Sequence, residues 1–554
     1  MSESSLTRRE ATSALLAASA LAVCPNGANA AAAAVPTRPV DTTSGKVRGM
    51  RSGGLSRFFG IPYGTDTARH RFQPAHAPEP WAGIRNCNEL GPKTPQGPIT
   101  ISGVMNRMSG QAKALPIIMK VAALTRGDVP QSEACLVLNV ITPDASPRRK
   151  RPVMVWLHGG GFAMGSGWDA MIDGSQLAAH GDVVYVSLNH RLNALGFLYL
   201  GGLHADFADS GNAGMLDIVL ALEWVRDNIA QFGGDPHNVT IFGQSGGGAK
   251  VSTLLGMPPA RGLFHKAIAM SGPVVKAVER TDAMAIAEQT LAKLGVAKSD
   301  VHTLQTMDHR KVIDAASSVR LPPGDGGIVS RTLAPMADGR SLPVHPFHPA
   351  ATDISRNIPL MIGTARDECT MFMAGDPELG AMSAEHALAR FKEAMGDARG
   401  EASFKAYRAA YPDDDPSYLV SSMMTDRMFR SDSIVMADRK SAQNAAPVFL
   451  YRVDYRPRVA DGILRSPHGT EVPLVFGTKV PVEFMGAGPE VDALSGTMMN
   501  AWLRFARSGN PDGKDLTWPR FDATRRPTML FDVQCRVAND PDPVSRDPVA
   551  RGLA

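Results

Sequence analysis

The sequence predicts an α/β protein in which a central, mostly parallel sheet has helices on both faces. Short apolar runs rich in β-branched residues read as buried strands, and longer helical patterns lie between them. Parallel strands that are covered on both faces are apolar along their whole length and need a crossover connection to the next strand. The strands expected on these grounds are 153–157, 183–188, 239–243, 267–270, 359–363 and 448–453.

The clearest helix is expected between Met215 and Ile229. Its apolar side chains recur at helical spacing and would form one buried face, while its charged side chains would face outward or form pairs. Gly233, Gly234 and Pro236 then end the helix. The apolar face consists of Leu216, Val219, Leu220, Leu222, Val225 and Ile229, and the charged residues are Asp217, Glu223, Arg226 and Asp227.

Composition places the chain among ordinary globular proteins. Its 554 residues are 44% hydrophobic and 20% charged, which excludes disordered, collagen-like and coiled-coil classes. A chain of this length buries a sizeable core without a stapling metal or disulfide. The 58 basic and 54 acidic residues leave a net charge of +4, and there is no basic tract with interleaved aromatic residues. We therefore expect no nucleic-acid partner.

The first thirty residues read as an export signal. Arg8 and Arg9 precede an apolar run over 13–23, and the small-residue exit Ala28-Asn29-Ala30 follows. The paired arginines favour the twin-arginine type, although an ordinary secretory signal remains the alternative. The apolar run is about half of the ~20 residues that cross a bilayer. We expect a periplasmic or secreted bacterial protein with no membrane span, whose residues 1–30 are removed.

The strongest chemical signal is Gly243-Gln244-Ser245-Gly246-Gly247, which directly follows strand 239–243 and precedes a helical pattern. G-x-S-x-G between a strand and a helix is the nucleophile elbow, a tight turn that raises a serine hydroxyl above the sheet. Glycines two residues before and after the serine avoid Cβ clashes in the turn. We expect Ser245 to be a nucleophile, and the N–H of Gly246 to face the same point and stabilise an oxyanion.

The residues around Ser245 exclude two other interpretations of this glycine-rich loop. A phosphate-binding loop needs a lysine directly after its second glycine, but Ala249 follows Gly248 and Lys250 comes one position late. A dinucleotide loop needs a glycine where Ser245 stands.

A second signal is His158-Gly159-Gly160-Gly161, at the end of strand 153–157. Successive glycines can turn several N–H groups into one concave anion-binding site. An oxyanion loop lies upstream of the nucleophile elbow in this type of arrangement, so we interpret Gly160 and Gly161 as oxyanion donors. His158 belongs to the loop itself and is expected to orient it rather than act as a base.

A serine nucleophile needs a histidine to take its proton and a carboxylate to orient that histidine, here in the order Ser, acid, His. His468 stands out among the later histidines, because Pro467 and Gly469 bracket it on a turn. The acid should follow strand 359–363, where Asp367 and Glu368 are adjacent. The residues alone do not choose between these two carboxylates.

Together these motifs resemble the type-B carboxylesterases, the cholinesterase-like branch of the α/β-hydrolases. The resemblance extends from Val47 to Phe531. It implies an α/β-hydrolase fold in a single domain, residues 35–554, with large insertions that form a gorge. The motifs are 59–63, 132–140, 158–162, 211–217, 232–248, 270–272, Asp367-Glu368, His468-Gly469-Thr470-Glu471, and 502–511.

The resemblance assigns the roles. It implies Ser245 as nucleophile, His468 as base and Glu368 as acid, with oxyanion donors on Gly160, Gly161 and Gly246; Ser271 matches a serine that hydrogen-bonds near such a triad. It further implies hydrolysis of a small-molecule carboxylic ester through an acyl-enzyme, without metal or organic cofactor. An amidase, lactonase or transacylase would use the same residues, and a non-catalytic binding protein would share the fold.

Some positions depart from the family pattern. Gln244 stands where glutamate is commoner, which removes a negative charge near the histidine. Cys135 matches the family's first disulfide, but Thr94 stands at the partner position, with Cys87 as a possible substitute. A Cys369–Cys535 pair is equally open, and buried free thiols are as well supported as disulfides. Phe162, Trp168, Met270 and the Met-rich stretch 101–119 are candidates for an apolar substrate pocket or for ordinary core.

Overall fold

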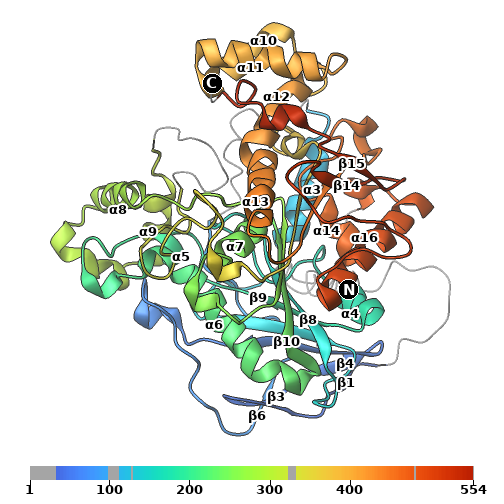
Figure 1. The fold of residues 1–554 in the computed structure, drawn as a ribbon. Coiled ribbons are helices and arrows are strands. Elements are labelled where there is room, and N and C mark those ends of the chain that lie inside the picture. Colours follow the sequence, from blue (N-terminus) through green and yellow to red (C-terminus); the bar gives the residue numbers. More distant parts are fainter. Residues whose placement is uncertain (1–32, 98–111, 127–128, 322–331, 480–481, 553–554) are drawn as a thin grey trace, which may run out of the picture.

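The computed structural model describes residues 33–97, 112–126, 129–321, 332–479 and 482–552, so the expected export signal lies outside the described residues. Within them a large sheet runs through the centre of the molecule (Figure 1). In order across the sheet, its strands are β1 (Val35–Pro36), β4 (Met50–Ser52), β5 (Leu55–Pro62), β7 (Val137–Thr142), β9 (Val184–Leu188), β8 (Arg151–Leu157), β10 (Gly234–Gln244), β11 (Lys266–Met270), β12 (Leu360–Ala365), β13 (Val448–Val453), β14 (Pro527–Phe531) and β15 (Arg536–Asn539). A small second sheet pairs β2 (Val40–Thr42), β3 (Gly45–Arg48) and β6 (Ile84–Asn86).

The sheet is parallel in its central part. Every neighbouring pair from β9 through β14 is parallel, whereas β1, β4, β5 and β7 on one side and β15 on the other are antiparallel. All the strands expected from the apolar runs are confirmed as β8 to β13. Because these strands are parallel, the loops after β8, β10, β12 and β13 leave the same edge of the sheet, where ligands bind in open α/β folds.

Both faces of the sheet are buried, which explains the continuous apolar runs. Along β8, Val153 and Val155 pack with α6 and α7 on one face, while Met154 and Trp156 pack with α4 and α16 on the other. The helices are α3 (Leu115–Arg126), α4 (Ser175–Gly181), α5 (Asn193–Phe197), α6 (Ala213–Asn228), α7 (Gly246–Leu254), α8 (Arg280–Leu294), α9 (His309–Ser317), α10 (Ala384–Met395), α11 (Asp397–Ala410), α12 (Pro416–Thr425), α13 (Ser431–Ser441), α14 (Glu471–Phe476), α15 (Val482–Met485) and α16 (Pro489–Ser508).

Helix α6 confirms the clearest helical pattern in the sequence, although it begins two residues before the expected start at Met215. Its Asp217 is fully buried rather than outward, because Arg191 pairs with it at 2.6 Å. The side chains of Leu216 and Leu220 are only partly buried against the core. A short 3-10 turn follows, and Gly233 ends it with a positive φ of 84°, the conformation that favours glycine.

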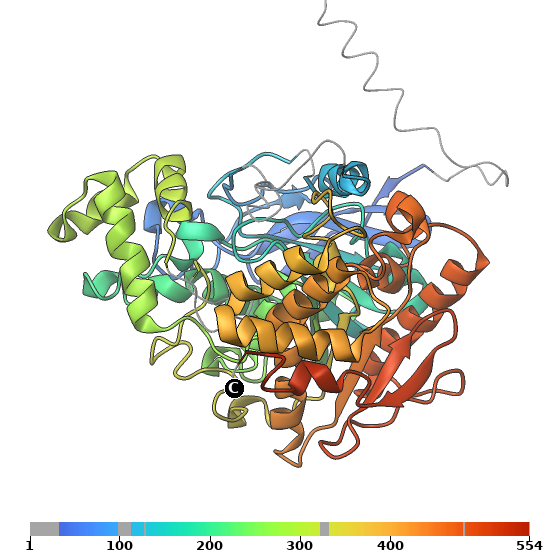
Figure 2. The same cartoon turned by 90° about the horizontal axis from the view of Figure 1, so that it is seen from above.

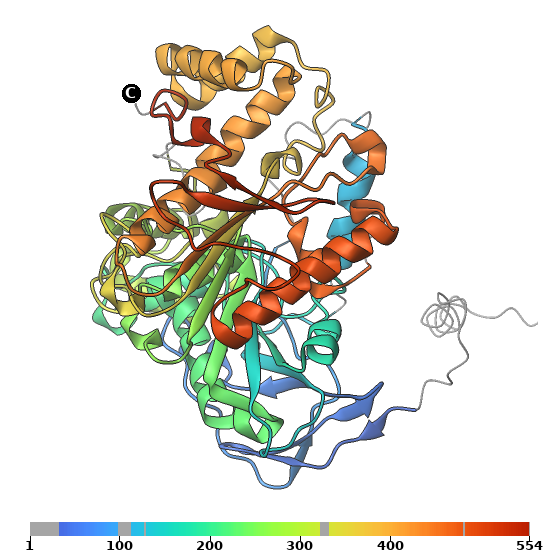
Figure 3. The ribbon, with the colours of Figure 1, turned by 45° about the vertical axis from the view of Figure 1, so that its right-hand side comes forward.

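Two groups of helices have cores of their own outside the sheet. Helices α10, α11 and α12 lie beyond one end of the sheet (Figures 1 and 3), and α8 and α9 pack beside α5 at its side (Figures 1 and 2). Part of the Met-rich stretch forms α3, while 98–111 lies outside the described residues. The gorge stays a prediction. No helix in the described ranges has both the length and the apolarity needed to cross a bilayer.

The structure decides the open question of the disulfides, and neither Cys87–Cys135 nor Cys369–Cys535 forms. All four described cysteines are free thiols, and Cys87, Cys135 and Cys369 are buried. Thr94 Oγ1 donates a hydrogen bond to Cys135 Sγ at 3.2 Å, so the residue at the family's partner position contacts the sulfur without a covalent bond. Burial raises the pKa of the Cys135 thiol to about 12, which keeps it protonated and unreactive.

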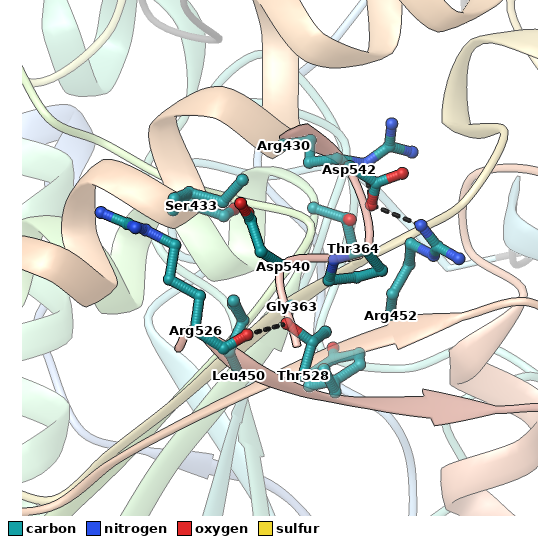
Figure 4. Close-up of a pocket in the computed structure, with 13 residues that line it drawn as sticks. Gly363, Thr364, Arg430, Ser433, Leu450, Arg452, Arg526, Thr528, Asp540 and Asp542 are labelled. Atoms are coloured by element: carbon teal, nitrogen blue, oxygen red, sulfur yellow. Dashed lines mark hydrogen bonds and ion pairs between the residues drawn. The ribbon is translucent and has the colours of Figure 1, made fainter. Parts of the chain in front are cut away.

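A charged pocket lies at the β12–β14 side of the sheet, remote in sequence from the elbow (Figure 4). Asp542 bridges two buried arginines there. Its Oδ2 accepts a hydrogen bond from Arg452 Nη1 and lies 3.7 Å from Arg430 Nε. Burial alone would raise the pKa of Asp542, but Arg430 and Arg452 hold it below its ordinary value. The hydrogen bond between Asp542 and Arg452, which lies on β13, ties the C-terminal segment to the sheet.

We expect Asp542→Ala to lower the free energy of unfolding by about 1.5–3 kcal/mol, because Arg430 and Arg452 lose their shared partner although each keeps a second buried carboxylate, Asp426 or Asp454. Because the pKa of Asp542 is depressed, the wild-type advantage should be full above pH 3.8 and fade as the pH falls through the lower folded-state value. Urea unfolding measures both effects. Asp413→Ala, at an exposed position, is the control. Equal losses in the two variants would contradict the stabilising role.

Candidate active site

The turn between β10 and α7 places Ser245 at the carboxyl edge of the sheet. Ser245 has φ 60° and ψ −127°, a strained conformation for a non-glycine residue, and its side chain is only partly buried. A Cβ on Gly243 would lie 2.5 Å from Leu157 O, and one on Gly247 only 1.9 Å from the same oxygen. Both glycines of G-x-S-x-G are therefore required by close packing against the end of β8.

The loop after β8 lies directly against this turn. A Cβ on Gly246 would be 2.5 Å from Gly161 N, so the two backbones touch. Gly160 and Gly161 have φ of 83° and 62°. No described residue offers a hydrogen-bond acceptor to the N–H of either glycine. Three N–H groups predicted as oxyanion donors thus belong to neighbouring segments, and two of them are unpaired.

Glu368 and His468 come together although a hundred residues separate them. His468 Nδ1 lies 2.6 Å from Glu368 Oε2, and Glu368 is fully buried. The other carboxylate oxygen accepts the N–H of Ala365 at 2.8 Å. With Nδ1–H donated to the carboxylate, the Nε2 atom of a neutral imidazole holds the free lone pair.

Asp367, the other candidate acid, has different partners. Its carboxylate accepts the N–H of Ser466 at 3.3 Å and lies 3.7 Å from Arg465. It therefore holds the segment that leads to His468. Of the two adjacent carboxylates, the structure brings only Glu368 to the imidazole.

The structure does not join Ser245 to His468 by a hydrogen bond. Instead, Gln244 Nε2 lies 3.2 Å from His468 Nε2, so the amide of the residue before Ser245 takes the place beside the imidazole lone pair. Catalytic hydrogen bonds are commonly long in unliganded enzymes and tighten when substrate binds. Of the two contacts that the predicted triad needs, the structure therefore shows the one between Glu368 and His468.

The electrostatics of His468 come from burial and from two carboxylates. Burial lowers its pKa, but Glu368 outweighs this and, with Glu471, raises the pKa above the ordinary value. The rings of Phe372 and Phe429 pack at 5.3 and 4.9 Å from the imidazole and keep water away from it. The surroundings therefore favour the imidazolium form while excluding solvent on that side.

Glu471 is a buried acid that the sequence offered only as part of a motif. It is fully buried, and Ser271 Oγ donates to its Oε1 at 2.8 Å. Burial and the nearby charge of Glu368 raise the pKa of Glu471 to about 7. Ser271 lies at a positive φ of 47° directly after β11. The resemblance had pointed to Ser271 as a serine that hydrogen-bonds near the triad, but for Glu471 the only sequence signal was its place in the motif after His468.

The expected pocket residues separate into core and surface. Met270 is fully buried in the sheet, and Phe162 packs on Phe197 with ring centroids 5.1 Å apart. Trp168 is only partly buried and meets Phe59 at 4.9 Å. Only Trp168 among these three has appreciable exposed surface.

One group in the described part of the chain has a donor set for a metal. The ligand atoms of His204, Asp206 and His302 lie within 4.8 Å of one another, and all three side chains are exposed. His204 Nδ1 already accepts the N–H of Asp206 at 3.3 Å. The group shares no residue with the turn, the loop or the His468 segment, so the candidate active site does not include it.

Comparison with known proteins agrees with this geometry. The sequence model of the Carboxylesterase family matches residues 36–544. The chain is 34% identical to para-nitrobenzyl esterase of Bacillus subtilis (strain 168), over 92% of this chain and 97% of the relative. It is 32% identical to phenmedipham hydrolase of Pseudarthrobacter oxydans, over 92% and 99%.

Solved structures give the same answer. A carboxylesterase of Geobacillus stearothermophilus superposes with a TM-score of 0.78 at 33% identity, covering 92% of this chain and 99% of that one. A structure of para-nitrobenzyl esterase gives 0.77 at 33% identity over 92% and 98%. The fold is therefore that of the α/β-hydrolases, and the enzymatic reaction is the hydrolysis of carboxylic esters. The chain belongs to the carboxylesterase family.

Proposed function

We propose that this carboxylesterase works through an acyl-enzyme on Ser245, with His468 as general base and Glu368 as the orienting acid. The observation that supports the proposal best is the 2.6 Å contact between Glu368 Oε2 and His468 Nδ1 beside the elbow. It fixes the tautomer in which Nε2 accepts a proton. The Ser245 hydroxyl then attacks the ester carbonyl while its proton moves to Nε2.

The negative charge that develops on the carbonyl oxygen is held by backbone N–H groups. Gly160 and Gly161 present unpaired N–H groups, and Gly246 begins a helix, whose first N–H groups have no intrahelical partner. Each such donor lowers the barrier by about 2.7–4 kcal/mol in measured cases. The donors are fixed before substrate arrives, so the charge meets oriented dipoles without reorganisation.

The tetrahedral intermediate collapses when the imidazolium of His468 gives its proton to the leaving alcohol. Water then enters, His468 removes its proton, and hydroxide adds to the acyl carbon. Collapse of the second intermediate releases the acid and returns the proton to Ser245. Glu368 orients the imidazole and stabilises the imidazolium in both halves. The amide of Gln244, 3.2 Å from Nε2, must give up this position when Ser245 engages the imidazole.

We infer small-molecule esters as substrates, with an aromatic alcohol as the first choice. Two relatives with coverage above 90% are named for para-nitrobenzyl esters and for phenmedipham. The partly exposed Trp168 and the phenylalanines around His468 offer aromatic contacts. An amidase, lactonase or transacylase reaction would need the same residues, and leaving-group choice follows from pocket shape.

We also propose that residues 1–30 direct export to the periplasm or medium through a twin-arginine signal. The support is the order Arg8-Arg9, apolar run 13–23 and Ala28-Asn29-Ala30.

Replacing the nucleophile tests the mechanism directly. Ser245→Ala should lower kcat for a 4-nitrophenyl ester by at least roughly 10⁴-fold, because no other group forms the acyl-enzyme. The variant should also lose labelling by a serine-reactive phosphonate, read by intact-protein mass. Ser271→Ala removes another hydroxyl near the site and should keep the label. Near-normal turnover by Ser245→Ala would refute the assignment.

The raised pKa of His468 predicts the pH profile. Neutral imidazole is the active base, so kcat/KM should rise with pH through a value above 6.5 and then level off. Gln244→Glu places a carboxylate beside the imidazolium and should move this limb to higher pH by about one unit or more. The pKa of Glu471 is about 7, so the apparent pKa of the profile belongs to His468 and Glu471 together.

Gln244→Met, which adds no charge, is the control for this profile and should leave the limb close to the wild-type position. A limb in Gln244→Glu that stays in place or moves to lower pH would contradict the assignment of His468 as the titrating base.

Export is tested with Arg8→Lys together with Arg9→Lys in the full chain. Esterase activity should then stay in the cytoplasmic fraction, because the twin-arginine route reads the guanidinium pair. An ordinary secretory signal needs only positive charge and would still deliver the protein. Unchanged activity in the exported fraction would therefore favour the ordinary signal over the twin-arginine one.

A further inference from the structure

Lys250 is a buried cation that the reaction as described above does not use. It lies in α7, five residues after Ser245, and its exposed fraction is 0%. No carboxylate of the described residues lies within ion-pair distance of its ammonium group. An unpaired ammonium group in a dry interior is unfavourable, and burial lowers the pKa of Lys250 to about 7. Its hydrogen bonds must therefore offset this cost.

Both hydrogen bonds of Lys250 go to the oxyanion loop. Its Nζ donates to His158 O at 2.8 Å and to Gly161 O at 3.0 Å. These carbonyls lie on either side of Gly159 and Gly160, so one side chain grips both ends of the glycine run. The ring of Phe162, the next residue, lies 5.4 Å from Nζ and adds a cation–π contact.

The imidazole of His158 holds the middle of the same loop. Its Nδ1 lies 2.8 Å from Gly159 O, the carbonyl of the peptide whose N–H belongs to Gly160. Burial and the nearby Lys250 lower the pKa of His158 well below its ordinary value, so the ring is neutral and donates from Nδ1. His190 stacks on this ring at 5.0 Å and 20°. Lys250 thus completes a support built wholly beneath the loop.

We propose that Lys250 is a positioning residue that fixes the oxyanion donors Gly160 and Gly161 relative to Ser245. The proposal rests on the proposed acyl-enzyme mechanism. The geometric reason is that α7 begins directly after Ser245 and also bears Lys250. One rigid helix therefore sets the place of Ser245, which directly precedes its first residue, and of the loop through Lys250, its fifth residue.

Glycines are the reason such a support matters here. Gly160 and Gly161 have no side chains to anchor them, and backbone conformations of glycine interconvert easily. Without a donor, the carbonyls of His158 and Gly161 would face the interior unpaired, and the loop would gain by turning them outward. That turn would move the N–H groups that stabilise the oxyanion.

The test compares Lys250→Met with the wild-type full chain. Met fills a similar volume without donating a hydrogen bond. We expect kcat for a 4-nitrophenyl ester to fall by roughly 10- to 100-fold, as for donors displaced by about 1 Å, with KM changed less than about threefold. The inhibition constant of a trifluoromethyl ketone, which binds as a hemiketal oxyanion, should rise by the same factor as kcat/KM falls.

The control is Thr253→Val, equally buried on α7, whose Oγ1 bonds only Ala249 O within the helix. It should keep wild-type kcat and ketone affinity. If Lys250 is merely structural, Lys250→Met will unfold at a lower temperature without a matched loss of ketone affinity. That outcome would overturn the proposal. Unchanged kcat and ketone affinity in Lys250→Met would do the same.

If Lys250→Met does not fold, Lys250→Gln decides by the same criterion, since its shorter amide cannot reach both carbonyls. Failure of the proposed mechanism would show differently. In that case Ser245→Ala would keep its turnover or its phosphonate label, whatever the Lys250 variants do.

Discussion

The site depends on how closely helix α7 approaches the end of strand β8. Leu157 O lies so near the elbow that a Cβ on Gly243 or Gly247 would overlap it. Any side chain there would push the start of α7 away from the sheet. Ser245 would lose its strained place above the edge, and Gly246 would leave Gly161. The proposed nucleophile and the proposed oxyanion donors are therefore held together by the absence of side chains, at a contact between backbones.

Close packing of this kind leaves little room for water, and the charges in the site follow from that. His468 is nearly buried between two carboxylates, Glu368 and Glu471. Of these, Glu368 is hydrogen-bonded to His468 and to Ala365 N, whereas burial and the nearby Glu368 raise the pKa of Glu471 to about 7. A third carboxylate at Gln244 would crowd the same dry volume with like charge. The neutral amide instead interacts with the imidazole directly, which explains the resting contact at 3.2 Å.

The sequence predicted those parts of the molecule that have a local signal. Central strands were found because parallel strands buried on both faces are apolar throughout, and β13 matches its expected limits, 448–453. The choice between Asp367 and Glu368 was beyond local pattern, because both follow β12 and only side-chain direction separates them. The partner of Asp217, Arg191, and the Asp542 network were not predicted for a related reason: ion pairs between distant segments leave no periodic trace in a sequence.

Lys250 belongs to the same class of feature, and its place shows why a motif alone understates this site. In the sequence it is a lysine one position too late for a phosphate loop. In the fold, the side chain of Lys250 points to the glycine loop 158–161, where its Nζ donates to the carbonyls of His158 and Gly161. The first N–H groups of α7 face the same region and bear the positive end of the helix dipole. The helix that begins directly after Ser245 thus also bears the side chain that bonds the glycine loop, so one rigid element links the proposed nucleophile to the proposed oxyanion donors.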